Sequence, residues 1–273
     1  MASSISKTLL LHFSQFLLKK RARACNHLDL QKSAIVFAPH EDDETLGCGG
    51  TILKKVQAGA NVQLVFMTDG RNSHRHLMSA NELIAKRKHE AIAAARMLGI
   101  EESNIHFLGF EDSKLQSLFK AAISETVDIL KSAQPDEVYL PYVHETPADH
   151  IATRKIVLES LSQTGLKPDI FEYPIWFWNH WPWTHPQMDS RREILSIIKS
   201  SFFAEWHLHK DLGCSVDISQ LVSIKRKALE KYESQMTRLV PDKRWLTLAD
   251  VANGEFLQCF FNEREYFYHY KIG

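Results

Sequence analysis

The sequence predicts an α/β fold in which helices cover both faces of a mostly parallel sheet. Short apolar runs of strand length alternate with longer amphipathic segments of helix length over about the first two thirds of the chain. The 273 residues are 44% hydrophobic, which is enough for one sizeable core. This alternation is typical of a three-layer, Rossmann-like architecture, whose right-handed crossovers bring every strand-to-helix loop to one edge.

Five apolar runs are expected to form the strands, and each ends in polar, glycine or proline residues. The first run ends abruptly in His40 and four acidic residues, before a glycine-rich turn. The five strands are expected at residues 34–39, 62–67, 105–108, 137–141 and 170–176.

Four helices are expected between and after these strands. The second ends naturally at Gly99, and the third is broken by Gln134-Pro135-Asp136. They are expected at residues 51–58, 82–98, 115–132 and 151–161.

The last third of the chain departs from this alternation and is expected to form a C-terminal elaboration of the same domain. It is predicted to contain a short helix near 193–200, strand-like segments around 202–215, a helix from about 220 to 235, and a helix and strand within 257–270. No linker separates it, so residues 33–273 are expected to be one domain, preceded by an N-terminal helical extension at 1–32.

The extension carries an apolar stretch at residues 9–18, followed by Lys19, Lys20, Arg21 and Arg23. The stretch is too short and too polar to cross a bilayer, and no cleavage site of a signal peptide follows it. We favour a helix packed on the domain or on a neighbouring subunit. The alternative is a basic amphipathic helix on a membrane surface.

Composition argues against a nucleic-acid partner and against sites built from cysteine. Lys and Arg total 33, as do Asp and Glu, so no basic field indicates nucleic-acid binding. The four Cys are scattered without a CxxC pair, which argues against a thiolate zinc site or disulfide framework and suits a reducing compartment.

A metal site is predicted at the end of the first strand. His40 and Asp43 are three residues apart on a tight turn, so both side chains can point into one site. A catalytic zinc takes three protein ligands from His and carboxylate and keeps one position open. The best third ligand is His150, in the loop between the fourth strand and its helix. Asp42 is then free to act as general base on the water at the metal.

These residues carry a family resemblance. His40-Glu41-Asp42-Asp43-Glu44 followed by Gly49-Gly50-Thr51 resembles the His-Pro-Asp-Asp-Glu signature of the PIG-L/LmbE family of zinc-dependent N-deacetylases. Further matches in family order cover about residues 33–235. They are Met67-Thr68-Asp69-Gly70, Arg87-Lys88-His89-Glu90, Phe107-Leu108-Gly109, Asp149-His150 and Lys227-Ala228-Leu229.

The resemblance implies that His40, Asp43 and His150 bind one zinc ion per chain and that Asp42 is the general base. Another divalent transition metal is the alternative. It also implies roles around the metal for three further residues. Glu44 would support the ligands, Asp149 would orient a ligand or neighbouring His, and Arg87 would lie against an acidic residue at the site or against substrate.

Two positions depart from the family pattern. Glu41 stands where the family has proline, and we expect this charge to face solvent. Pro147 stands where the family has a histidine that stabilises the tetrahedral intermediate, and proline has no side-chain donor. His144, three residues earlier, is our candidate for that catalytic role. If no group takes it, zinc alone holds the oxyanion.

Other candidates have two interpretations each. Asp69 either binds a substrate hydroxyl or caps a turn. Trp178, in a tryptophan-rich segment after the fifth strand, either faces a sugar ring or packs in the core. For Gly47, Gly49 and Gly50 we favour close helix–strand packing over a phosphate cradle, because the spacing is not GxGxxG.

Together these features predict a hydrolase that removes acetyl groups from an N-acetylated amino sugar or glycoconjugate, with N-acetylglucosamine compounds as the implied substrates. The alternatives are an amidase acting on a non-sugar amide and a non-catalytic metal-containing glycan-binding protein. The family resemblance allows a homo-oligomer. We expect a cytoplasmic location, with peripheral membrane association as the alternative.

Overall fold

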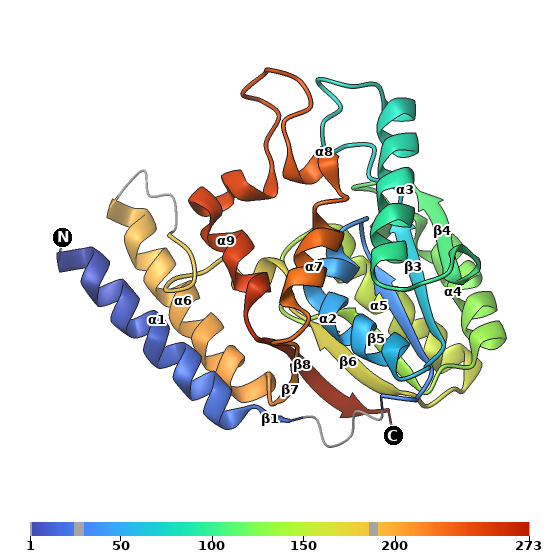
Figure 1. Cartoon of the computed structure of the whole chain (residues 1–273), viewed down its shortest axis with the longest axis horizontal. Helices are drawn as coiled ribbons and strands as arrows, with labels where there is room; N and C mark the ends of the chain where they lie inside the picture. Colours follow the sequence, from blue (N-terminus) through green and yellow to red (C-terminus); the bar gives the residue numbers. More distant parts are fainter. Residues whose placement is uncertain (1, 25–29, 186–190, 273) are drawn as a thin grey trace.

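An eight-stranded sheet forms the centre of the part of the chain that the computed structural model describes, residues 2–24, 30–185 and 191–272 (Figure 1). The strands lie in the order β1-β7-β8-β6-β5-β2-β3-β4. The five strands from β4 to β6 are mutually parallel, which confirms the predicted fold class, whereas β8 is antiparallel to both β6 and β7. The bounds are β1 Arg23–Ala24, β2 Ala34–Ala38, β3 Val62–Thr68, β4 Ile105–Phe110, β5 Glu137–Pro141, β6 Asp169–Tyr173, β7 Cys214–Asp217 and β8 Arg264–Lys271.

Helices pack on both faces of this sheet (Figure 1). Helices α2, α3 and α7 lie together on one face, and α4 and α5 pack against each other on the opposite face. The bounds are α1 Ala2–Arg21, α2 Asp43–Gln57, α3 Ala80–Met97, α4 Phe119–Ala133, α5 Ala148–Thr164, α6 Arg191–Asp211, α7 Val222–Leu229, α8 Glu233–Met236 and α9 Glu255–Gln258.

Strand β2 occupies the position in the sheet that decides where a ligand binds. It pairs with β3 on one side and with β5 on the other, and the chain builds outward from it in both directions. The loops after β2 and β5 therefore diverge to opposite faces and leave a crevice at the carboxyl ends of the two strands.

The helix predicted near residues 193–200 is present, but the prediction of strand-like segments around residues 202–215 was wrong for most of that range. Helix α6 runs without interruption from Arg191 to Asp211, through the segment expected to be strand-like, and only β7 at Cys214–Asp217 is extended. Phe202 and Phe203, at the start of the segment expected to be strand-like, lie on the exposed side of α6. The buried side chains Ser201, Ala204 and Leu208 follow helical spacing instead.

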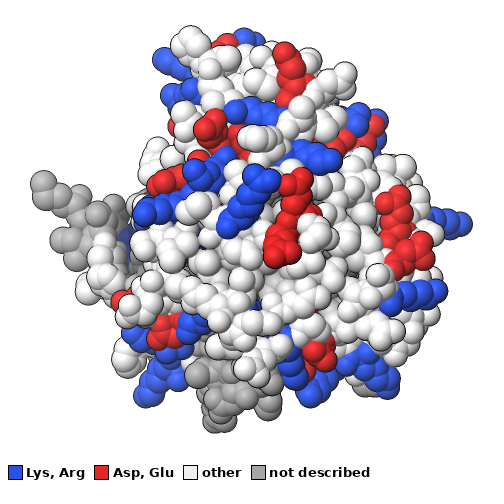
Figure 2. All heavy atoms as spheres, turned by 45° about the vertical axis from the view of Figure 1, so that its right-hand side comes forward, with Lys and Arg blue, Asp and Glu red and all other residues white. Residues whose placement is uncertain are grey.

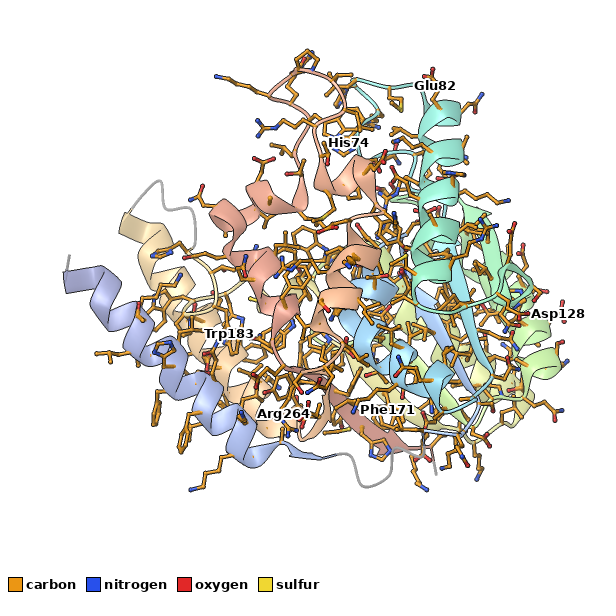
Figure 3. All side chains as sticks on the ribbon, in the orientation of Figure 1. His74, Glu82, Asp128, Phe171, Trp183 and Arg264 are labelled. Atoms are coloured by element: carbon orange, nitrogen blue, oxygen red, sulfur yellow. The ribbon has the colours of Figure 1, made fainter. Side chains whose placement is uncertain are left out.

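The N-terminal helix α1 packs beside α6 (Figure 1). The hydroxyl of Ser14 donates to Glu205 of α6 at 2.5 Å, and the indole N–H of Trp183 donates to the same carboxylate at 2.7 Å. Trp183 lies close to both helices in Figure 3. In the portion of the chain that the structure describes, no helix is both long and apolar enough to span a bilayer.

Close approach explains the glycines of α2. A side chain at Gly47 would collide with the ring of Tyr173, and one at Gly50 would collide with Ile218. The backbone N–H of Gly50 instead donates to Glu265 of β8 at 2.7 Å. The packing interpretation of these glycines is therefore confirmed.

Two surface and covalent features complete the fold. The expectation of unpaired cysteines was wrong for Cys214, which is disulfide-bonded, whereas Cys48 and Cys259 are free thiols.

The face shown in Figure 2 carries Lys and Arg side chains interspersed with Asp and Glu, as the balanced composition predicts.

Candidate metal centre

The end of β2 brings two of the predicted ligands together. His40 follows the strand, and Asp43 begins α2 one turn later. Oδ2 of Asp43 accepts a hydrogen bond from the backbone N–H of His40 at 3.1 Å and lies 3.4 Å from Nδ1 of the same residue. The carboxylate of Asp43 is therefore held next to Nδ1, at the edge of the His40 ring.

His150 reaches the same carboxylate from α5. It is fully buried, and its Nε2 lies 3.3 Å from Oδ2 of Asp43. Its other nitrogen, Nδ1, lies 3.1 Å from Oε2 of Glu145. We call His40, Asp43 and His150 the His40 cluster; their donor atoms all lie within 4.8 Å of one another.

Glu145 is a residue of this site that was not predicted from the sequence. Its buried carboxylate accepts hydrogen bonds from the backbone N–H groups of Ile175, Trp176 and Phe177, at 2.8–3.0 Å. It is thereby held beside His150, in the arrangement by which an outer carboxylate orients a metal-binding histidine. Its place in the sequence, in the loop between β5 and α5 and five residues before His150, was the available signal.

Two more carboxylates face the opposite side of the His40 ring. Oδ1 of Asp112 and Oδ2 of Asp149 each lie 3.4 Å from its Nε2. Asp149 is positioned by the backbone N–H groups of Ser113 and Leu115, so it sits where an orienting role was expected. Asp112 was missed, although it follows β4 at the same edge of the sheet.

The electrostatics of the His40 cluster favour a bound cation. Burial disfavours charge on His150, yet Asp43 and Glu145 raise the pKa of this imidazole to about 9. Burial likewise disfavours charge on Asp43, yet the two imidazoles hold the pKa of its carboxyl below the ordinary value. The surrounding carboxylates therefore concentrate positive charge at this point, whether a proton or a metal supplies it.

Asp42 lies beside the cluster with a strained backbone. Its φ of 131° is in a region that non-glycine residues rarely adopt. Burial, together with repulsion from Asp43, raises the pKa of its carboxyl well above the ordinary value, even though Arg87 opposes this shift. A carboxylate with a raised affinity for a proton suits general base chemistry.

The expectation that Glu41 faces solvent was wrong. Glu41 is only 1% exposed, and its carboxylate lies 3.0 Å from Nε of the equally buried Arg87. The same guanidinium donates to the backbone carbonyl of Glu41 and lies 3.8 Å from Asp42. Arg87 thus lies against acidic residues at the site, and its charge allows a glutamate to be buried where the family has proline.

Glu44 supports the turn between β2 and α2. Its carboxylate accepts hydrogen bonds from the hydroxyl of Tyr232 at 2.5 Å and from the backbone N–H of Asp42 at 3.2 Å. Because it is fully buried, the pKa of Glu44 rises to about 7. It is placed to hold the backbone of Asp42 rather than to contact a ligand.

A cavity of about 310 Å³ opens beside the cluster. Its lining contains polar and apolar side chains, and the rings of Trp176 and Phe256 stack with their centroids 4.9 Å apart. Its lining comprises His40, Asp42, Asp43, Leu46, Asn72, Ser73, Arg87, Asp112, Ser113, Pro147, Ile175, Trp176, Gln235, Leu248 and Phe256.

Six predicted site residues do not line this cavity, namely Glu44, Asp69, His144, Asp149, His150 and Trp178. His144 instead lies with its ring 3.8 Å from that of His207, on α6. Trp178 packs in the core against Trp183, so Trp176 is the tryptophan that faces the cavity. Asp69 accepts a hydrogen bond from the backbone N–H of Arg71 at 3.2 Å, as in the turn-capping interpretation.

The residues present fit a zinc-type cation. Two imidazoles and one carboxylate form a common catalytic donor set, and donor separations of 3.3–3.4 Å suit bonds of about 2.0–2.1 Å to a tetrahedral metal. Both ring nitrogens of the buried His150 lack a hydrogen-bond partner, and Nε2 faces Asp43 while Nδ1 faces Glu145. A buried imidazole nitrogen that lacks a hydrogen bond and faces a carboxylate is available to bind a metal ion.

Comparisons with known proteins agree with this site. Residues 35–161 match the PIG-L family model, described as GlcNAc-PI de-N-acetylase. The chain is similar to the diacetylchitobiose deacetylase of Thermococcus kodakarensis, with 27% identity over 220 residues, or 78% of this chain and 72% of that enzyme. It is 27% identical over 140 residues to the probable N-acetyl-alpha-D-glucosaminyl L-malate deacetylase 2 of Bacillus cereus, covering 49% of this chain and 63% of that protein.

A solved structure extends the similarity to nearly the whole fold. The N,N'-diacetylchitobiose deacetylase from Pyrococcus horikoshii superposes with a TM-score of 0.60 at 25% identity. The alignment covers 94% of this chain and 92% of that one. The chain is thus similar to PIG-L/LmbE N-deacetylases in sequence and in fold, and it is an enzyme that hydrolyses N-acetyl amide bonds.

Proposed function

We propose that this enzyme is zinc-dependent and removes the acetyl group from an N-acetylated amino sugar or glycoconjugate. One observation carries the proposal. The His40 cluster, with two imidazoles and a carboxylate at metal-ligand spacing, borders a cavity whose wall includes the strained carboxylate Asp42.

The cavity supports a sugar as substrate. Its volume of about 310 Å³ is at the lower end of the ~300–1,000 Å³ typical of small-molecule sites, so one N-acetylated sugar unit enters and any remainder stays outside. Trp176 and Phe256 offer aromatic surface to the apolar C–H face of a sugar ring. Asn72, Ser73 and Gln235 offer hydrogen-bonding groups to its hydroxyls.

His40, Asp43 and His150 would hold the zinc ion. When bound, zinc supplies a Lewis acid that polarises the amide carbonyl and lowers the pKa of water to about 7. Glu145 fixes the orientation of His150, and Asp149 and Asp112 face the far nitrogen of His40.

Asp42 performs the proton transfers in the proposed reaction. Its carboxylate takes a proton from the attacking water and returns it to the nitrogen of the leaving amine as the C–N bond breaks. Water is consumed, and acetate and a free amine are formed. Arg87 and Glu44 hold Asp42 in place from two sides, through its carboxylate and its backbone N–H respectively.

Pro147 favours a second candidate function. It lines the cavity where the family has a catalytic histidine, and it offers no donor to an oxyanion. Loss of one such donor typically costs roughly 100- to 1,000-fold in rate. An amidase that acts on a more reactive, non-sugar amide would tolerate this loss better than an enzyme for unactivated acetamides.

Acetate release from N-acetylglucosamine compounds tests the proposal, with zinc measured in the same samples. Asp42→Asn should lower kcat by roughly 10²–10⁴-fold while zinc stays bound, because the general base is lost and the ligands are not. Asp128→Asn on α4, away from the cavity lining, is the matched control and should retain full activity. Bound zinc without acetate release from any amino sugar would instead favour the amidase.

A further inference from the structure

A second cluster of histidine and aspartate lies outside the catalytic cavity. His144 comes from the loop after β5, while His207 and Asp211 lie one turn apart on α6. Oδ2 of Asp211 lies 2.9 Å from Nδ1 of His207 and 3.7 Å from Nε2 of His144. We call these three residues the His144 cluster; none of them lines the catalytic cavity.

The spacing of the His144 cluster suits one metal ion. Its three donor atoms all lie within 4.8 Å of one another. Two bonds of about 2.0–2.1 Å at a tetrahedral angle place donors roughly 3.3 Å apart, and the observed 2.9 and 3.7 Å bracket this value. Two ligands four residues apart on one helix face are a common way to present a pair of donors to zinc.

The surroundings of the cluster also resemble those of a metal site. The buried Tyr142 donates its hydroxyl to Oδ2 of Asp211 at 2.7 Å and so fixes the carboxylate. The rings of Phe203 and Trp206 pack edge-on against that of His207, which is itself buried. The side chain of His144 is 28% exposed, which leaves a route for an ion and a position for a further ligand.

We propose that His144, His207 and Asp211 form a second divalent-metal site that fastens α6 to the loop after β5. Two imidazoles and a carboxylate select a borderline transition metal such as Zn²⁺ over Mg²⁺ or Ca²⁺. The site is separate from the proposed catalytic zinc. The two sites are nevertheless adjacent in the chain. One peptide bond joins His144 to Glu145, and the carboxylate of Glu145 lies against His150.

Metal stoichiometry tests this proposal. Full-length protein without a histidine tag is stripped with chelator, reloaded with Zn²⁺, freed of excess ion and analysed by mass spectrometry. The wild type should hold two zinc ions per chain, His207→Ala one, His150→Ala one, and the double variant none. His269→Ala is the control, because this histidine pairs with Asp169 away from both clusters, and it should hold two.

A second variant and a second readout protect the test against misfolding. His144→Gln changes a partly exposed loop residue and should also lose one zinc ion. In the His150→Ala background, Zn²⁺ should raise Tm and protect α6 from proteolysis, and the additional change His207→Ala should abolish both effects. Equal zinc content in the wild type, His207→Ala and His144→Gln would overturn the proposal.

Discussion

The His40 and His144 clusters contain the same donor groups, two histidines and one aspartate, in different surroundings. The His40 cluster lies at the carboxyl ends of parallel strands, where Glu145, Asp149 and Asp112 surround it and a cavity adjoins it. The His144 cluster lies between a loop and a helix, with a tyrosine and aromatic rings around it. Only the first has a free carboxylate beside an open space. In the proposed function the ligand set alone therefore does not make a catalytic site, and the neighbouring carboxylate of Asp42 and the cavity distinguish the His40 cluster.

Removing one histidine from each cluster should separate the two roles most sharply. His150→Ala should lower acetate release by roughly 1,000-fold or more, because a catalytic metal contributes several kcal/mol to transition-state stabilisation. His207→Ala should leave kcat within about twofold at saturating zinc. Equal losses of activity in the two variants would show that the clusters act as one unit.

The buried charge pair beneath Asp42 should dominate stability. Arg87→Met leaves Glu41 and Asp42 buried without their cation, and we expect a loss of about 3–5 kcal/mol in the free energy of unfolding, measured with urea. Arg96→Met, on the same helix, is the matched control. Arg96 pairs with Glu102 at 2.8 Å but is 65% exposed, so its loss should cost less than about 1 kcal/mol.

The outer partners should affect metal affinity less than the ligands do. Glu145→Gln should weaken zinc binding at the His40 cluster by roughly 10- to 100-fold, because His150 loses its carboxylate partner. Competition with a chelator of known affinity measures this change. Tyr142→Phe is the counterpart at the His144 cluster, and it should leave the affinity of the His40 cluster unchanged.

The smallest expected effect is a pH dependence in the attachment of α6 and α1. Burial disfavours charge on Glu205, but His180, His209 and Ser14 hold its pKa at about 2. An unfolded glutamate has a pKa of about 4.3, so the unfolded state binds more protons between these values. The ionised carboxylate of Glu205 therefore contributes on the order of 1 kcal/mol to the free energy of unfolding. This contribution is complete above about pH 5 and is lost as pH falls toward 2.

Thermal unfolding between pH 6 and pH 2 checks this dependence. Glu205→Gln should unfold at a lower temperature than the wild type at pH 6, and the difference should shrink as pH falls. A difference that stays constant or grows toward low pH would contradict the assignment to this carboxylate.

The sequence was most informative where local pattern and function coincide. The apolar runs of β2 to β6 and the polar residues that follow them predicted the parallel sheet and its ligand edge. Glu41 and Glu145 could not be assigned, because their partners, Arg87 and three backbone N–H groups of residues 175–177, are distant in the chain. The second half of helix α6 was not predicted, and its aromatic residues Phe202, Phe203 and Trp206 face outward, against the usual rule of burial.

Strand β8 has a consequence for the order in which the chain folds during synthesis. It is the last strand in the sequence, yet it lies between β6 and β7 and joins β7 and β1 to the parallel strands. Until the ribosome has released residues 264–271, the edge of β6 has no partner, and α2 and Lys225 lack the carboxylate of Glu265. The nascent chain can therefore assemble β2 to β6 early, but the helix that carries Asp43 gains its final support only when translation has passed the end of β8.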